Sequence, residues 1–184
     1  MRPVAERADT LRPVPTDDPS ADDSFADVTT ANAAFAESFE YDHLEATAAR
    51  GLGVLTCMDS RIDPLAMLGI KRGDAKILRN AGARVTDDVL RTLVLADYLL
   101  GVQRVMVVAH TRCRMAAGDQ AGVHDAIRAA GGPDTRSIAF LTTDDQEATL
   151  RFDVQRIVSW PYLTNVAVGG FLYDLESGLL RRVC

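Results

Sequence analysis

The sequence predicts an α/β fold with a mostly parallel central β-sheet flanked by helices and an antiparallel edge strand near the C-terminus. Short apolar runs alternate with segments of helical periodicity after residue 50. The run 104–109 (RVMVVA) is rich in β-branched residues and lacks polar alternation, which is typical of a strand covered on both faces. The last two apolar runs flank the turn 176–178, which favours an antiparallel hairpin.

The other elements follow the same alternation. Residues 52–57, 75–78, 165–173 and 179–183 are the further strand candidates. A helix is predicted over 86–100, because Thr86 can cap it, Asp87 and Asp88 favour its positive N-terminal end, and Gly101 can end it. Only three residues between 89 and 100 are polar, so we expect this helix to be largely buried.

A further helix is predicted near the C-terminus. Thr143 and Gln146 form a capping-box pattern at its start. The apolar face of this helix is expected to hold four residues: Leu150, Val154, Ile157 and Val158.

The N-terminal 27 residues differ in composition from the rest of the chain. They contain four of the seven prolines and few bulky apolar side chains, which predicts a disordered tail. Residues 28–50, with Phe35, Phe39 and Leu44 among alanines, predict a helical arm. We therefore expect a tail over 1–27 and a single domain over 28–184 that begins with this arm.

The composition argues against nucleic-acid and membrane partners and indicates the cellular compartment. With 184 residues, a formal net charge of -6 and a pI near 5.0, the chain is unsuited to general binding of nucleic acid or anionic membranes. No stretch approaches the ~18 apolar residues of a membrane span. Three cysteines argue against a disulfide framework, and we expect a cytoplasmic protein.

Two clusters of chemically versatile residues follow two predicted parallel strands. One contains Cys57, Asp59 and Arg61, and the other contains His110 and Cys113. Sites in open α/β sheets form beyond the carboxyl ends of strands, so adjacent strands would bring these clusters together. Two thiolates and one imidazole suit tetrahedral Zn²⁺, and three protein ligands leave the fourth position for water. The alternative is that each cysteine is simply a small buried apolar residue.

Asp59 and Arg61 strengthen the zinc hypothesis. A carboxylate two residues from a metal ligand can accept a hydrogen bond from zinc-bound hydroxide. An arginine two residues further along can hold that carboxylate ionised through a charge-assisted contact. A solvated surface ion pair, which would contribute little, is the alternative.

These residues resemble the β-class carbonic anhydrase family. Cys57-x-Asp59-x-Arg61 is similar to the first metal motif and catalytic dyad of the family, and His110-x-x-Cys113 is similar to the second. The resemblance covers about residues 30–183 and includes further stretches: Arg79-Asn80-Ala81-Gly82, Thr86-Asp87-Asp88, Gly170-Phe171-Leu172-Tyr173-Asp174 and Gly178-Leu179.

The resemblance implies one zinc ion per subunit, held by Cys57, His110 and Cys113, and reversible hydration of CO₂ to bicarbonate and a proton by zinc-bound hydroxide. It implies Asp59 and Arg61 as catalytic residues, with Asp59 as a possible fourth ligand in a closed form. It also implies a homodimer or higher homo-oligomer. Members gated by bicarbonate tend to carry a tryptophan where Val54 stands, which favours an ungated site here.

Three residues depart from the pattern of the family. Arg112 stands where an aspartate or a small residue is common, Arg114 where glycine is very common, and Ala83 where glycine or asparagine is frequent. Two other functions remain open. One is hydrolysis of a CO₂ analogue such as CS₂ or COS on the same site, for which the motifs would be identical. The other is a zinc-binding regulatory protein whose catalysis has decayed, and Arg112 and Arg114 are its only support.

Overall fold

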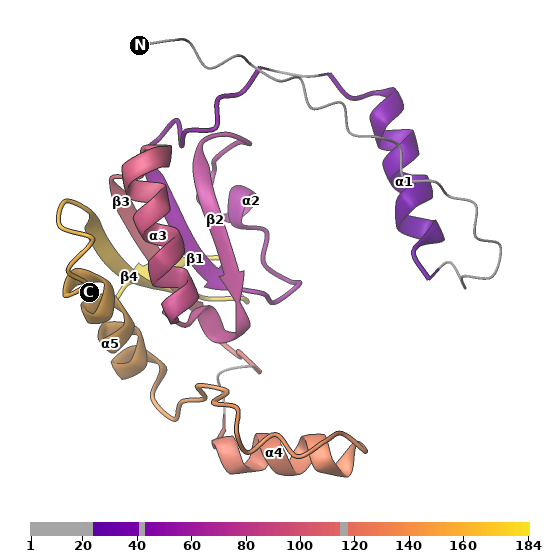
Figure 1. The fold of residues 1–184 in the computed structure, drawn as a ribbon, viewed down its shortest axis with the longest axis vertical. Coiled ribbons are helices and arrows are strands. Elements are labelled where there is room, and N and C mark those ends of the chain that lie inside the picture. Colours follow the sequence, from indigo (N-terminus) through magenta and orange to yellow (C-terminus); the bar gives the residue numbers. More distant parts are fainter. Residues whose placement is uncertain (1–23, 41–42, 115–117) are drawn as a thin grey trace, which may run out of the picture. The chain divides into compact units, whose positions relative to one another are not determined.

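A computed structural model describes residues 24–40, 43–114 and 118–184. The chain divides into two compact units, Met1–Asp42 and His43–Cys184. In the first unit, helix α1 spans Ala26–Glu37 (Figure 1). Most of the expected N-terminal tail, residues 1–23, lies outside the described residues.

The expected helical arm is helical over only part of its length. Helix α1 ends at Glu37, and residues 43–50 have no helical hydrogen bonding. Their backbone groups bind the rest of the second unit instead: Ala48 N–H donates to the Leu100 carbonyl at 2.8 Å, and Ala49 N–H donates to the Gly73 carbonyl at 3.0 Å. These donors are therefore not available for continuing a helix.

The second unit is built on a five-stranded sheet with the strand order β2-β1-β3-β4-β5. The strands are β1 (Leu52–Cys57), β2 (Ala75–Asn80), β3 (Arg104–His110), β4 (Ala167–Tyr173) and β5 (Leu180–Arg182). The pairs β1–β2, β1–β3 and β3–β4 are parallel, and β4–β5 is antiparallel. The predicted fold class is confirmed, including the antiparallel edge strand.

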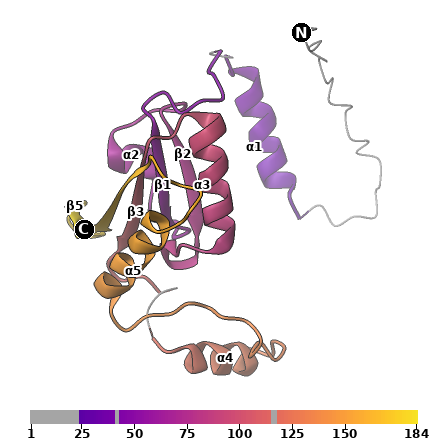
Figure 2. The same cartoon turned by 60° about the vertical axis from the view of Figure 1, so that its left-hand side comes forward.

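Helices cover both faces of this sheet. They are α2 (Pro64–Leu68) on one face and α3 (Asp87–Leu100) and α5 (Gln146–Val158) on the other. Helix α4 (Gln120–Ala129) lies away from the sheet (Figures 1 and 2), and the 3₁₀ turn η1 spans Ala81–Ala83. Alternate residues of a strand point to opposite faces. Leu55 and Val107 accordingly pack with α3 and α5, whereas Val54 and Val108 pack with α2 (Figures 1 and 2).

Helix α3 has the predicted ends but not the predicted burial. The Thr86 hydroxyl accepts from Val89 N–H, and Gly101 ends the helix in the left-handed conformation. One face is buried, whereas Leu95, Tyr98 and Leu99 on the other are 44%, 64% and 68% exposed. The expectation of a largely buried helix is therefore wrong, because only one face of α3 meets the sheet.

Helix α5 begins with a different cap from the one predicted. The Asp145 carboxylate accepts from Ala148 N–H at 2.9 Å, so Asp145 is the N-cap and Thr143 lies outside the helix. Leu150, Val154 and Ile157 are buried as predicted, but Val158 is exposed because it is the last helical residue. Helix α4 was not predicted, and none of its residues is buried.

Candidate metal centre

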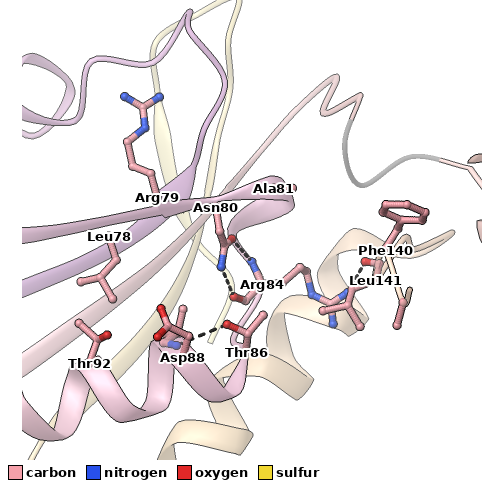
Figure 3. A pocket seen from close by; sticks show the side chains of 12 residues that line it. Leu78, Arg79, Asn80, Ala81, Arg84, Thr86, Asp88, Thr92, Phe140 and Leu141 are labelled. Atoms are coloured by element: carbon pink, nitrogen blue, oxygen red, sulfur yellow. Dashed lines mark hydrogen bonds between the residues drawn. The ribbon is translucent and has the colours of Figure 1, made fainter. Parts of the chain in front are cut away.

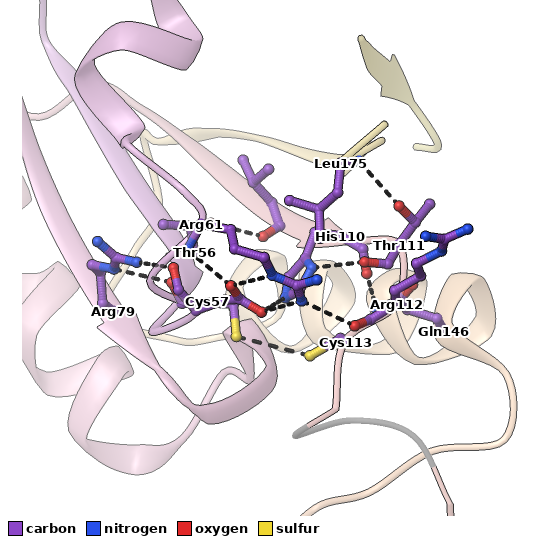
Figure 4. Close-up of polar contacts among 12 residues, drawn as sticks. Thr56, Cys57, Arg61, Arg79, His110, Thr111, Arg112, Cys113, Gln146 and Leu175 are labelled. Atoms are coloured by element: carbon purple, nitrogen blue, oxygen red, sulfur yellow. Dashed lines mark hydrogen bonds and ion pairs between the residues drawn. The ribbon is translucent and has the colours of Figure 1, made fainter. Parts of the chain in front are cut away.

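The two predicted clusters meet because their strands are neighbours in the sheet. Cys57 is the last residue of β1 and His110 is the last residue of β3, and the parallel register pairs Thr56 with Val108. Both strands therefore deliver their chemistry to the same edge. Cys113 follows His110 after a turn in which Arg112 has φ of +55° (Figure 4).

The three candidate ligand atoms form a tight, buried group. The Sγ atoms of Cys57 and Cys113 are 3.8 Å apart, and these atoms and a ring nitrogen of His110 all lie within 4.8 Å of one another. Cys57 and His110 are fully buried and Cys113 is 5% exposed. Two thiolates at about 2.3 Å from a tetrahedral Zn²⁺ would be about 3.8 Å apart, so the spacing of the sulfur atoms fits zinc.

The imidazole of His110 is prepared to bind a metal. Its Nδ1 lies 2.9 Å from the Thr111 carbonyl oxygen, which can only accept, so Nδ1 carries the proton. Nε2 is buried and has no hydrogen-bond partner among the described residues. Burial lowers the pKa of His110, which favours the neutral ring that a metal requires. An orphaned buried acceptor beside two thiols fits a bound cation.

Asp59 and Arg61 form a bidentate ion pair next to these three ligand atoms. Arg61 Nε donates to Asp59 Oδ1 at 2.9 Å and Nη2 donates to Oδ2 at 2.6 Å. The Arg61 side-chain hydrogen bonds hold the pKa of Asp59 well below its usual range, so the carboxylate is ionised. Asp59 Oδ2 also lies 3.8 Å from His110 Nε2, which places the carboxylate at the candidate site.

Sequence reasoning missed two residues that hold the ligand-bearing backbone. Arg79 at the end of β2 donates from Nε to the Cys57 carbonyl at 3.0 Å and from Nη2 to the Asp59 carbonyl at 2.6 Å. Gln146 of α5 donates from Nε2 to the His110 carbonyl at 2.9 Å (Figure 4). Arg79 stands within a stretch that carries the family resemblance, but nothing in the sequence indicates that Gln146 reaches β3.

The arginines that depart from the pattern of the family are both exposed. Arg112 forms an ion pair with Glu176, and its side chain is 69% exposed. Its backbone carbonyl accepts from Arg61 Nη2 at 3.3 Å, so its main chain contacts the dyad while its side chain faces solvent. Arg114 is exposed as well. Ala83 is buried with φ of +57°, a conformation that favours glycine or asparagine.

A cleft of about 480 Å³ lies beside this site, between the end of β2, the start of α3 and residues 139–141 (Figure 3). Arg79 and Asn80 line it, as do Thr86 and Phe140. No candidate metal ligand lines the cleft. The cleft is therefore a neighbour of the metal group rather than its cavity.

Comparison with known proteins identifies the family. Residues 52–132 match the family model described as carbonic anhydrase. The chain is 34% identical over 143 residues to β-carbonic anhydrase 1 of Mycobacterium tuberculosis. The aligned region covers 72% of this chain and 81% of that relative. The chain belongs to the β-carbonic anhydrase family. Membership indicates carbonic anhydrase activity and a zinc cofactor, for which Cys57, His110 and Cys113 form a group that could hold one ion.

The chain is also similar to solved carbonic anhydrase structures and to a second group of relatives, the carbon disulfide hydrolases. A carbonic anhydrase from Streptococcus mutans superposes with a TM-score of 0.81 at 33% identity, covering 87% of this chain and 97% of that one. A carbon disulfide hydrolase of Acidithiobacillus thiooxidans is 28% identical over 152 residues, covering 72% of this chain and 76% of that relative. Among the residues that the structure describes, none of the helices has both the length and the apolar character of a membrane span.

Proposed function

We propose that Cys57, His110 and Cys113 hold one zinc ion per chain, and that Asp59 and Arg61 serve it in the reversible hydration of CO₂ to bicarbonate and a proton. The observation that carries this proposal is the buried pair of sulfur atoms 3.8 Å apart, beside an imidazole nitrogen that has no hydrogen-bond partner among the described residues. Zinc bound there would make a water molecule acidic enough to supply hydroxide near neutral pH.

The residues of the chain have separate roles in this proposal. Asp59 is ionised and faces the candidate site, so it would accept a hydrogen bond from a hydroxide supplied there and hold the lone pair of that hydroxide toward CO₂. Arg61 is a positioning residue, because it binds both oxygens of that carboxylate. With both oxygens engaged by Arg61, Asp59 is placed to stay off the metal, which supports an open form of the site.

A second candidate function is hydrolysis of CS₂ or COS on the same residues. The support is the group of carbon disulfide hydrolases among the relatives. One of them, from an Acidianus strain, is 48% identical over 66 residues, which are 36% of this chain and 32% of that relative. The third candidate, a decayed zinc-binding regulator, was motivated by Arg112 and Arg114. Its support is weakened because both arginines are exposed rather than aimed at the ligands.

We also propose a cytoplasmic homodimer. Cys57, Cys113 and Cys184 are free thiols, and a reducing compartment would keep Cys57 and Cys113 available for zinc. Leu95, Tyr98 and Leu99 expose a row of large apolar side chains on α3, which a second subunit would cover.

The test is a substrate panel on the purified chain after its zinc content has been measured. Stopped-flow hydration of CO₂ and release of sulfide from CS₂ and COS are followed on the same preparation. We expect about one zinc ion per chain and hydration of CO₂ as the fastest reaction. Faster turnover of CS₂ or COS would favour the second function, and zinc without any turnover would favour the third.

A further inference from the structure

The backbone of His110 lies at the point where one of the two ladders of β3 has already stopped. β3 pairs with β4 as far as His110, opposite Tyr173, but its pairing with β1 ends at Thr56 and Val108. The ladder to β1 thus ends two residues before the candidate ligand. A buried carbonyl beyond the end of a ladder needs another donor, because leaving it unsatisfied is costly.

Gln146 supplies that donor from a different element. Its Nε2 donates to the His110 carbonyl at 2.9 Å, although the two residues are 36 positions apart. Gln146 is the first residue of α5, and the helix is capped by Asp145, so the amide of Gln146 is free to reach the strand. The sequence pattern predicts a capping box that includes this side chain, but in the structure Gln146 donates to the backbone of a candidate ligand instead.

Two hydrogen bonds then fix His110 in complementary ways. Gln146 holds the main chain, and the bond from Nδ1 to the Thr111 carbonyl holds the ring. The turn that follows is itself held, because Thr111 N–H donates to the Tyr173 carbonyl at 2.9 Å. With the main chain and the ring both fixed, the direction of Nε2 toward the two thiols is determined.

We propose that Gln146 is a positioning residue of the metal centre, completing the end of β3 so that His110 Nε2 stays aimed at the position between Cys57 and Cys113. This proposal rests on the proposed zinc site. It predicts that loss of the donor loosens the imidazole ligand and shortens the retention of zinc, although Gln146 touches neither metal nor substrate.

The variant Gln146→Glu removes the hydrogen-bond donor without destabilising helix α5. The ionised carboxylate cannot donate and would repel the His110 carbonyl. At the first position of α5 the same negative charge suits the positive end of the helix, so the helix itself should not weaken. Gln155→Glu is the matched control, because Gln155 lies on the same helix and is exposed.

Zinc transfer from the holoprotein to a chelator is the main measurement, and the absorption of the Co²⁺-substituted chain is the second. We expect Gln146→Glu to hold zinc about 10- to 100-fold more weakly than the parent and to have an altered Co²⁺ spectrum. Gln155→Glu should match the parent in both. Gln146→Met, of similar length but without a donor, should show a weakening in the same direction.

The outcomes separate this inference from the proposed function. A parent chain that binds no zinc would contradict the proposed function itself. A parent that binds zinc, with Gln146→Glu and Gln146→Met equal to it in retention and spectrum, would overturn the role of Gln146 alone. If Gln146→Glu does not fold, as judged by circular dichroism, Gln146→Met decides.

Discussion

At the scale of single residues, Arg61 sets the charge state of Asp59. Both oxygens of Asp59 are bound by Arg61, and the depressed pKa of Asp59 keeps it charged far below neutral pH. A group with a depressed pKa in the folded state loses its charge only as the pH falls through that lowered value. Asp59 therefore contributes no titration to the rate at neutral or alkaline pH.

The dyad variants follow from this charge state. Asp59→Asn and Arg61→Ala should retain zinc but lose CO₂ hydration by about 10- to 100-fold, because they alter the orientation of the hydroxide and not the ligands. The loss should be similar across neutral and alkaline pH. Zinc content and stopped-flow rates measure the two effects separately. Parent-like rates in both variants would rule out the proposed role of the dyad.

The exposed arginines give a prediction of no effect. The Arg112 side chain is directed to Glu176 and solvent, where screening by water weakens its influence on the metal. The double variant Arg112→Asp/Arg114→Gly should therefore keep the pH midpoint of CO₂ hydration. A midpoint moved to higher pH would show that the two guanidinium groups do act on the site. A higher rate at every pH would instead show that Arg114 obstructs it.

At the scale of the elements, an ion pair fixes α5 against the turn η1. Arg84 Nε donates to Asp153 Oδ2 at 2.6 Å, and the two side chains are only 13% and 3% exposed. Arg84→Ala would leave the Asp153 charge buried without its partner, which should lower the free energy of unfolding by about 3 kcal/mol.

Urea denaturation measures this loss, with Arg91→Ala as the control. The Arg91–Asp88 pair is of the same type but well exposed, so its loss should lower the free energy of unfolding by less than about 1 kcal/mol. If the two variants lost the same free energy of unfolding, the buried Arg84–Asp153 pair would contribute no more to stability than an exposed one.

Apolar runs and end signals allowed much of the fold to be predicted from the sequence. The run 52–57 coincides with β1, and Thr86 and Gly101 mark the ends of α3, because these features depend on local chemistry. Helix α4 was not predicted, although its sequence is amphipathic and Asp119 caps its start, and none of its residues is buried. The cap of α5 was misplaced because Asp145 and Thr143 both suit the role locally.

The candidate site was predictable to the extent that its residues lie at strand ends. Cys57 and His110 stand where apolar runs stop, and the structure brings them together with Cys113. The contacts of Arg79 and Gln146 were not predictable, because each links segments 20 or more residues apart through a backbone carbonyl. Such contacts depend on tertiary packing and leave no periodic pattern.

At the scale of the whole molecule, the apolar face of α3 bears on the oligomeric state. Leu95, Tyr98 and Leu99 are exposed in the single chain, and apolar side chains gathered on one helix face favour association. We expect the full-length chain to have the mass of a dimer in light scattering. A monomer at micromolar concentration would contradict the proposed assembly.

Deletion of residues 1–23 tests whether the N-terminal segment contributes to the dimer or to the site. Because α1 begins at Ala26, a deletion of residues 1–23 leaves that helix whole. The composition of this segment argues against a packing role, so its removal should leave zinc content, dimer mass and CO₂ hydration unchanged. Loss of the dimer or of zinc would show that the segment is part of the folded protein.

X-ray absorption at the zinc edge of the purified chain tests the central claim most directly, because it reports the atoms bound to the metal. The account predicts two sulfur neighbours at about 2.3 Å and two lighter neighbours at about 2.0 to 2.1 Å, one of them an imidazole nitrogen. Cys57→Ser and Cys113→Ser should each remove one sulfur or empty the site. A zinc shell without sulfur, or a chain that holds no zinc, would contradict the account.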